Sequence, residues 1–338
     1  MKRILVLGGT QFVGRNLVET LLTLPNCDLT LFNRGKTNPH LFPQVKRLFG
    51  DRQVFSDLDK IGQQDWDIVF DCSAYFPIPL DHLLNQLKGK VGRYIYISTA
   101  SIYDFDQITN EWIDERCPIV PCSEQEKTNA EAWSYNARKA ECERVVRSKD
   151  WLPYLIFRPG LIIGPHDPTD RLYYWFYKVQ KRFAFLMPDG GQYQLSFTDV
   201  TDLVRIMVQS MDIQQEREVY NTSSYVSSIR AFVRGAMQVL KKRPNLIYVN
   251  AAFLDRHQVA RWTGLPLWVD EDVLKLDPTH LRLDFEFEPS TLEMTIAKLV
   301  TYYRNILAWR EPGQDLKTFN ALTQARENEL IQALRFSN

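Results

Sequence analysis

Hydrophobic and polar positions alternate along the first 160 residues in blocks that predict strands and helices in turn. The first block, Ile4–Leu7, is entirely apolar and predicts a buried strand. Apolar residues from Phe12 to Leu22 then recur at helical spacing, and Pro25 ends this predicted helix. Because strands and helices alternate, the pattern predicts an α/β fold with a doubly wound parallel sheet. Further strands are predicted at 28–33, 45–50, 67–72, 93–98 and 153–158, and a long helix at 131–149.

The pattern changes after Arg158, where an aromatic run, Tyr173–Tyr177, begins a different region. This run is interpreted as a buried helix face or, for some of its residues, as the wall of a substrate pocket. A strand and helix near 193–211 and a strand at 219–223 are expected to return to the first domain. We therefore expect one domain at 1–158, with returns near 190–225, and a smaller, mostly helical C-terminal substrate-binding domain. The second domain comprises 159–189 and 226–338, and ends with helices at 292–307 and from about Leu316 onward.

The composition is typical of a globular protein without a strong general attraction to nucleic acid or membrane. Of 338 residues, 45% are hydrophobic and 24% are charged, and 41 basic residues balance 41 acidic ones. Five scattered cysteines indicate free thiols in a reducing compartment, and no metal site is expected. No apolar run has membrane-spanning length, and the first strand begins at Lys2, which predicts a cytoplasmic protein without a leader peptide.

A glycine-rich turn joins the first strand to the first helix, in the context that a Rossmann-type dinucleotide site requires. Gly8 suits the tight turn, and Gly14 allows the helix to pack closely on the strand. Gln11 stands where a glycine usually lets the backbone approach the pyrophosphate. The free N–H groups and dipole of the helix then favour a phosphate there, although a strand, turn and helix without a ligand stays the alternative. The predicted cofactor contacts of this turn are Gly8, Thr10, Gln11, Phe12, Val13 and Gly14.

Candidate chemistry lies on the helix that precedes the sixth strand. Tyr135 and Lys139 are four residues apart and share one helix face. A free tyrosine has a pKa of about 10, and a nearby ammonium group favours the phenolate, so Tyr135 could exchange a proton with a substrate. Lys139 could also hold the ribose hydroxyls of a cofactor. Hydroxyls at the end of the fifth strand, among them Thr99, would face the same crevice. The alternatives are a surface Tyr–Lys pair and hydroxyls that cap the backbone.

Together these three features resemble the short-chain dehydrogenase/reductase superfamily, and in particular its extended or atypical NAD-dependent epimerase/dehydratase-like branch. Four further segments carry this resemblance, which covers residues 1 to about 225. They are Asn33-Arg34-Gly35-Lys36, Gly50-Asp51-Arg52, Asp67 to Ala74, and Ser196 to Leu203.

The resemblance implies catalysis by Thr99, Tyr135 and Lys139, with hydride transfer to or from a nicotinamide. It also implies a role for each of several residues at the ends of the strands. Asp51 and Arg52 would lie near the adenine, Ser73 and Ala74 would contact ribose and phosphate through their backbone, and Pro159 and Leu161 would pass the nicotinamide.

Two positions depart from the family pattern. Asn33, Arg34 and Lys36 stand where NAD-preferring members carry an acid, so NADP is the expected cofactor and NAD the alternative. Arg34 and Lys36 could instead be solvated loop charges. Leu161 replaces an asparagine that holds the nucleotide phosphate in many sugar-nucleotide epimerases, which argues against a UDP-sugar substrate.

Three functions are compatible with the sequence. The first is an NAD(P)-dependent oxidoreductase, epimerase or dehydratase that acts on a hydroxyl or carbonyl of a small molecule, with a homodimer left open. The second is RNA binding, because the sequence also resembles chloroplast RNA-binding relatives that share the glycine turn; the neutral charge argues against it. The third is a regulator that binds NADP without turnover.

Overall fold

The structure is a computed structural model that describes residues 1–213, 217–269, 271–272, 274–314 and 319–336. The chain divides into two compact units, each built from three separate segments. Unit 1 comprises 1–162, 200–223 and 276–288, and unit 2 comprises 163–199, 224–275 and 289–338. This division differs from the expected one in four places, since 190–199 and 224–225 belong to unit 2, and 159–162 and 276–288 belong to unit 1.

Unit 1 contains a seven-stranded parallel sheet in the order β10-β6-β5-β4-β1-β2-β3. The chain moves outward from β1 in one direction through β2 and β3, and from β4 in the other, so the strand order reverses between β1 and β4. The doubly wound parallel sheet predicted from the sequence is therefore confirmed. The strands are β1 (Lys2–Leu7), β2 (Cys27–Asn33), β3 (Lys46–Phe49), β4 (Trp66–Asp71), β5 (Val91–Ile97), β6 (Tyr154–Pro159) and β10 (Val219–Thr222).

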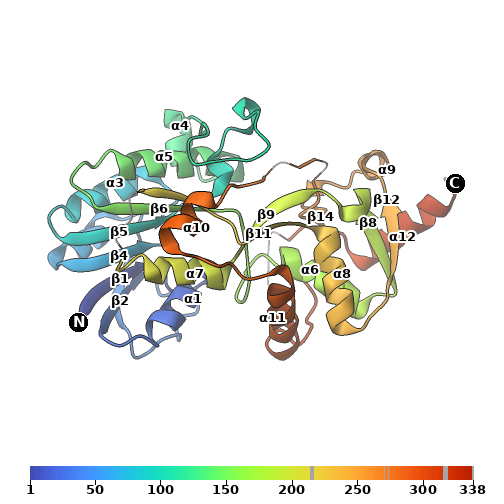
Figure 1. Cartoon of the computed structure of the whole chain (residues 1–338), viewed down its shortest axis with the longest axis horizontal. Helices are drawn as coiled ribbons and strands as arrows, with labels where there is room; N and C mark the ends of the chain where they lie inside the picture. The colour runs from blue at the N-terminus through green and yellow to red at the C-terminus, as the bar shows by residue number, and fades with distance from the viewer. Residues whose placement is uncertain (214–216, 270, 273, 315–318, 337–338) are drawn as a thin grey trace. The chain divides into compact units, whose positions relative to one another are not determined.

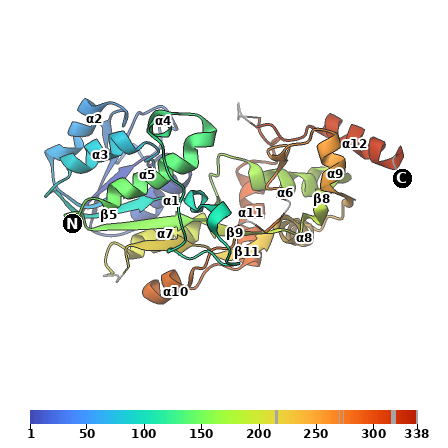
Figure 2. The ribbon, with the colours of Figure 1, turned by 90° about the horizontal axis from the view of Figure 1, so that it is seen from above.

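Helices cover both faces of this sheet (Figure 1). Alternate strand residues face opposite cores: Ile4 and Val6 pack with α1 and α7, whereas Leu5 and Leu7 pack with α3 and α5. Seen from above, α3 and α5 lie over the sheet (Figure 2). The helices of unit 1 are α1 (Phe12–Leu21), α2 (Phe55–Asp59), α3 (Pro77–Gln86), α4 (Glu124–Thr128), α5 (Tyr135–Arg147), α7 (Val200–Gln209) and α10 (Thr279–Phe285).

The long helix expected at 131–149 begins later than predicted. Residues Ala132–Ser134 form a separate 3-10 turn, and α5 starts at Tyr135. The Ser134 hydroxyl donates to the carbonyl oxygens of Asn129 and Glu131, both at 2.9 Å. A side chain that bonds to the preceding backbone in this way competes with regular helix, which explains the late start.

Unit 2 is built around aromatic helices and short strand pairs. In the run expected to be a helix face, Tyr173, Tyr174, Trp175 and Phe176 are buried on α6, which confirms that interpretation for these four residues. The helix expected from about Leu316 begins at Gln324, while 315–318 lie outside the described residues. The elements are α6 (Arg171–Lys181), α8 (Ile229–Leu240), α9 (Ala251–Arg256), α11 (Leu292–Asn305) and α12 (Gln324–Phe336), with β8 (Ala184–Pro188), β9 (Gln194–Asp199), β11 (Tyr225–Ser228), β12 (Asn245–Val249), β13 (Arg261–Trp262) and β14 (Leu265–Pro266); β7 (Leu161–Ile163) lies at the boundary of the units.

None of the helices in the described part of the chain combines the length and the apolar character that crossing a membrane requires.

Candidate active site

The candidate site residues of unit 1 converge on one edge of the sheet. Because all seven strands are parallel, the residues that follow them meet at the carboxyl edge. The glycine turn follows β1, and Ser73 follows β4, so these two meet where the strand order reverses. Such a switch point is where open α/β sheets bind their ligands.

The glycine turn has a geometry that side chains would disrupt. Gly8 has a φ of +89°, and a Cβ atom there would lie 2.8 Å from the Cβ of Ser73. A Cβ atom on Gly14 would lie 2.2 Å from the carbonyl oxygen of Gly8. Both roles predicted for these glycines, the tight turn and the close helix approach, therefore fit the backbone.

The helix that follows the turn begins at Phe12, with Gln11 as its N-cap residue. Gln11 has extended backbone, is exposed, and makes no side-chain capping bond to any residue the structure describes. Thr10 and Val13 are buried, and the carbonyl oxygen of Thr10 accepts a hydrogen bond from Asn38 at 2.9 Å. The first N–H groups of α1 are therefore not occupied by the Gln11 side chain, which leaves them suited to an anion.

The end of β2 carries the residues expected to select the cofactor. Asn33 Oδ1 accepts from the backbone N–H of Gly35 at 3.0 Å, while its Nδ2 is buried without a partner among the described residues. Arg34 and Lys36 are exposed. A guanidinium nitrogen of Arg34 lies 3.8 Å from a carboxylate oxygen of Asp51, with both side chains partly exposed. An exposed pair of this kind contributes little to stability, so Arg34 can change partner at small cost.

A buried ion pair links the end of β3 to the end of β4. Two nitrogens of Arg52 donate to the two carboxylate oxygens of Asp71 at 2.8 and 2.9 Å, and Nη1 also donates to Ser73 Oγ at 2.8 Å. Asp71 is fully buried and accepts a third bond from the Tyr94 hydroxyl at 2.5 Å. Burial alone would raise the pKa of Asp71, but the charge and hydrogen bonds of Arg52 outweigh it and hold this pKa below the ordinary value.

The family resemblance implied that Arg52 lies near the adenine, and Asp71 was not predicted as a site residue. The available signal was an acid that ends an otherwise apolar strand, because a buried carboxylate requires a partner. That partner could not be identified from spacing, since Arg52 precedes Asp71 by 19 residues.

Lys139 is the most constrained of the predicted catalytic residues. Its ammonium group is buried and donates to the carbonyl oxygens of Ala74 at 3.0 Å and Ile97 at 2.7 Å. It also lies 4.3 Å from the centre of the Tyr96 ring and 5.4 Å from that of Tyr75. Burial lowers the pKa of Lys139 to about 8. An ammonium has three hydrogens, so one is left for a ligand at the carboxyl edge.

Tyr135 and Thr99 occupy the two elements expected for them. Tyr135 is the first residue of α5 and is half-buried, and its ring lies 6.2 Å from the ring of Tyr75. Thr99 directly follows β5, where its Oγ1 accepts from the N–H of Ser101 at 3.2 Å and caps a short 3-10 turn. The neighbouring Ser98 hydroxyl is buried without a partner among the described residues. Pro159 and Leu161 are both buried at the end of β6 and just beyond it.

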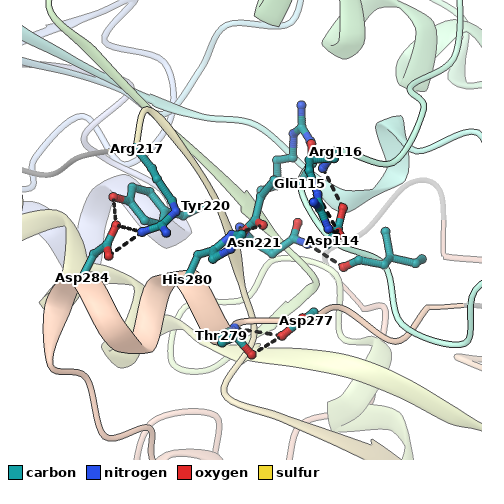
Figure 3. Close-up of polar contacts among 12 residues, drawn as sticks. Asp114, Glu115, Arg116, Arg217, Tyr220, Asn221, Asp277, Thr279, His280 and Asp284 are labelled. Carbon is teal, nitrogen blue, oxygen red and sulfur yellow. Dashed lines mark hydrogen bonds and ion pairs between the residues drawn. The ribbon is translucent and has the colours of Figure 1, made fainter.

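A second polar cluster in unit 1 joins three distant segments (Figure 3). Glu115 Oε1 accepts from the backbone N–H of Asn221 at 2.7 Å, and its Oε2 lies 2.9 Å from His280 Nδ1. The Asn221 side chain donates to the carbonyl oxygen of Ile113 at 2.7 Å. Asp284 binds Arg217 and Tyr220, which fixes α10 to β10. This cluster was not predicted from the sequence, and its satisfied hydrogen bonds indicate a structural role.

The curated proteins that resemble the chain include a protein of plant chloroplasts. The chain is 24% identical over 239 residues to the chloroplast stem-loop binding protein of 41 kDa b from Arabidopsis thaliana. The match covers 66% of this chain and 58% of the relative, so the chain spans less than two thirds of the relative's length.

Solved structures of two enzymes share the fold. One is dTDP-glucose 4,6-dehydratase from Bacillus anthracis in complex with NAD, with a TM-score of 0.71, 17% identity and coverage of 92% of this chain and 99% of that chain. The other is UDP-glucose 4-epimerase from Thermotoga maritima with UDP-glucose, with a TM-score of 0.70, 17% identity and coverage of 90% and 99%.

The family itself is shown by a match along most of unit 1. The sequence pattern of the NAD dependent epimerase/dehydratase family matches residues 4–222, about two thirds of the chain. This range includes the glycine turn, Thr99, Tyr135 and Lys139, and it confirms the resemblance found in the sequence. The chain therefore belongs to the NAD dependent epimerase/dehydratase family of enzymes.

Proposed function

We propose that the chain binds a nicotinamide dinucleotide along the carboxyl edge of the unit 1 sheet and uses it to oxidise and reduce a small molecule. The substrate carries a hydroxyl or carbonyl group, and sugar nucleotides are the class that the named structural neighbours suggest. The observation that carries the proposal is the buried Lys139 ammonium, which donates to the carbonyl oxygens of Ala74 and Ile97 and makes no third hydrogen bond to the residues that the structure describes.

The residues at this edge fit a dinucleotide. The glycine turn offers a cradle that a Cβ atom would fill at Gly8 and Gly14. Asn33 Nδ2 is a buried donor without a protein partner in the described chain, at the position where the family holds the adenosine ribose. The third hydrogen of Lys139 would reach the other ribose. These donors span the edge from β2 to β5, as an extended dinucleotide requires.

When bound, the nicotinamide supplies the site that accepts or donates a hydride. Tyr135 would hold or release the proton of the reacting hydroxyl at its Oη atom. Lys139 would favour the phenolate form of Tyr135 through its positive charge and would hold the ribose. Thr99 would donate to the reacting oxygen from the end of β5, after release of the hydrogen bond that its Oγ1 donates to Ser101 Oγ at 3.2 Å.

We further propose that NADP binds more tightly than NAD. Neutral Asn33 and exposed Arg34 suit a 2′-phosphate, and among the described residues the one ion pair of Arg34 is the 3.8 Å contact with Asp51. A phosphate would offer Arg34 a stronger, charge-assisted partner.

The experiment is a titration of the purified chain with NADH and NADPH, followed by assays for turnover. Reactions with UDP-glucose, dTDP-glucose and a panel of simple carbonyl compounds would be followed through nicotinamide absorbance and product analysis. Tyr135→Phe should remove turnover, whereas Tyr248→Phe, an exposed control in unit 2, should leave it unchanged. The proposal fails if neither cofactor binds, or if Tyr135→Phe turns over substrate at the wild-type rate.

RNA binding is a second candidate, because the curated relative is named for stem-loop binding. Retention of a stem-loop RNA on filters over a range of salt concentrations would test it. Strong retention that falls with salt, together with no binding of either cofactor, would favour this second candidate over the enzyme.

A further inference from the structure

We propose that the hydroxyl of Ser73 donates a hydrogen bond to the pyrophosphate of the dinucleotide, and that Arg52, held in place by Asp71, orients this hydroxyl for that purpose. The inference rests on the proposed function, since it concerns the same cofactor site. It assigns a ligand contact to the Ser73 side chain and positioning roles to Arg52 and Asp71.

Ser73 lies directly against the glycine turn. It follows β4, and Gly8 follows the neighbouring strand β1, so the two meet at the switch point of the sheet. A Cβ atom built on Gly8 would lie 2.8 Å from Ser73 Cβ and 3.1 Å from Ser73 Oγ. A phosphate group that approaches the backbone of the turn therefore comes within reach of the Ser73 hydroxyl.

The hydrogen bonds around Ser73 occupy a lone pair of its hydroxyl oxygen and leave the hydroxyl hydrogen available for donation. Oγ accepts from Arg52 Nη1 at 2.8 Å, and the backbone N–H of Ser73 donates to Asp71 Oδ1 at 2.9 Å. A serine hydroxyl has one hydrogen to donate, and within the described chain no protein acceptor takes it. Because Arg52 has no acceptor atom, it can only occupy a lone pair of Oγ, so the hydroxyl hydrogen points elsewhere. An anionic oxygen is the partner that such a donor favours.

Arg52 can orient Ser73 because it is itself fixed. Both carboxylate oxygens of Asp71 receive a bond from it, and Tyr94 and the Ser73 backbone satisfy Asp71 further. Asp71 stays ionised, since Arg52 holds its pKa below the ordinary value despite full burial. The guanidinium therefore keeps a single arrangement in which Nη1 faces Ser73. This donor would also offset the absence of a glycine at Gln11, where the turn lacks its usual close backbone approach.

The test measures how tightly the full chain binds NADH, ADP and adenosine by isothermal titration. ADP contains the pyrophosphate and adenosine lacks it. Ser73→Ala should weaken binding of NADH and of ADP about tenfold or more, the effect of losing a hydrogen bond to a charged group, and leave adenosine binding unchanged. Ser148→Ala, which removes an exposed hydroxyl at the far end of α5, is the matched control and should change none of the three.

A second variant tests the positioning role. Arg52→Met combined with Asp71→Leu removes the buried pair as a unit, so no unpaired charge is left in the core. In that background Ser73→Ala should weaken ADP binding by a clearly smaller factor than in the wild type, because the hydroxyl is no longer oriented. An equal factor in both backgrounds would contradict the positioning role.

Two results would overturn the inference. The first is that Ser73→Ala binds ADP as tightly as the wild type does. The second is that Ser73→Ala loses as much affinity for adenosine as for ADP, which would indicate general damage to the site. If NADH binds the wild type and Ser73→Ala has no effect, only this inference fails. If the wild type binds neither NADH nor ADP, the proposed function fails with it.

Discussion

Cofactor binding should weaken above pH 8 because of one lysine. Burial lowers the pKa of Lys139 to about 8 in the free protein, and its ammonium donates to two carbonyl oxygens. We expect the third hydrogen of this ammonium to bond the ribose of a bound cofactor. A hydrogen bond from a charged donor contributes about 1.5–3 kcal/mol, which corresponds to about 1–2 pKa units. Bound cofactor should therefore raise the pKa of Lys139 to about 9–10, since ligand binding favours the protonated form.

The direction and size of the change in Kd with pH follow from this shift in the pKa of Lys139. Below about pH 7 Lys139 is protonated with and without cofactor, so the Kd for NADH should be constant. Between pH 8 and about 9–10 the free protein loses the proton that the complex keeps, so Kd should rise about tenfold per pH unit. At higher pH both forms are neutral and Kd should level off at about 10–100 times its starting value.

Fluorescence titration with NADH from pH 6.5 to 10 would measure this profile, because NADH lacks a 2′-phosphate that could titrate. Lys139→Met should bind more weakly at pH 7 and show no rise. Lys178 in unit 2 also has its pKa lowered to about 8 by burial, so Lys178→Arg, which keeps a cation beside Glu327, should retain the wild-type rise. A constant wild-type Kd from pH 7 to 9.5, or the same rise in Lys139→Met, would refute the reasoning.

Other substitutions test the cofactor preference, the proton transfer and the core of unit 1. Asn33→Asp should shift the preference from NADPH to NADH, because a carboxylate accepts from a 2′-hydroxyl and repels a 2′-phosphate. Arg34→Ala should weaken the binding of NADPH by about tenfold and leave the binding of NADH unchanged. Equal affinities of the wild type for NADPH and NADH would contradict both predictions. Tyr135→Phe should abolish turnover and leave the Kd for NADH nearly unchanged, as measured with any substrate that the assays identify. Arg158→Met should lower the free energy of unfolding in urea by about 3–5 kcal/mol, because Glu143 is fully buried and loses the partner that bonds it at 2.6–3.1 Å; adding Glu143→Leu should restore most of this loss, and no restoration would contradict the ion-pair explanation.

The seven-stranded sheet could be predicted because its signal is local. Strands buried on both faces are apolar runs, and β1, β2, β4 and β5 agree with the predicted ranges within about two residues. The start of α5 could not be predicted, because it depends on a hydroxyl that bonds to nearby carbonyls rather than on hydrophobic spacing. The return of 276–288 to unit 1 was also missed, since the apolar residues of α10 do not indicate which of two cores they join.

In the candidate site, too, local motifs could be predicted from the sequence and long-range contacts could not. Gly8, Gly14 and Lys139 were identifiable because a short motif places each of them next to a known element. The ion pair of Arg52 with Asp71 and the contact of Glu115 with His280 join residues 19 and 165 positions apart. The tertiary structure brings these partners together, and the residues next to each of them in the sequence do not specify the pairing.

Unit 1 is built from separate segments of the chain, and this affects its folding during synthesis. β6 pairs with β10 on its outer side, but most of the chain between them, 163–199, belongs to unit 2. During synthesis the edge of β6 therefore stays unpaired until Val219–Thr222 has left the ribosome, a delay of a few seconds at about 5–20 residues per second. An unpaired strand edge is a template for aggregation, so a nascent chain that stalls before Val219 should depend on a chaperone to cover it.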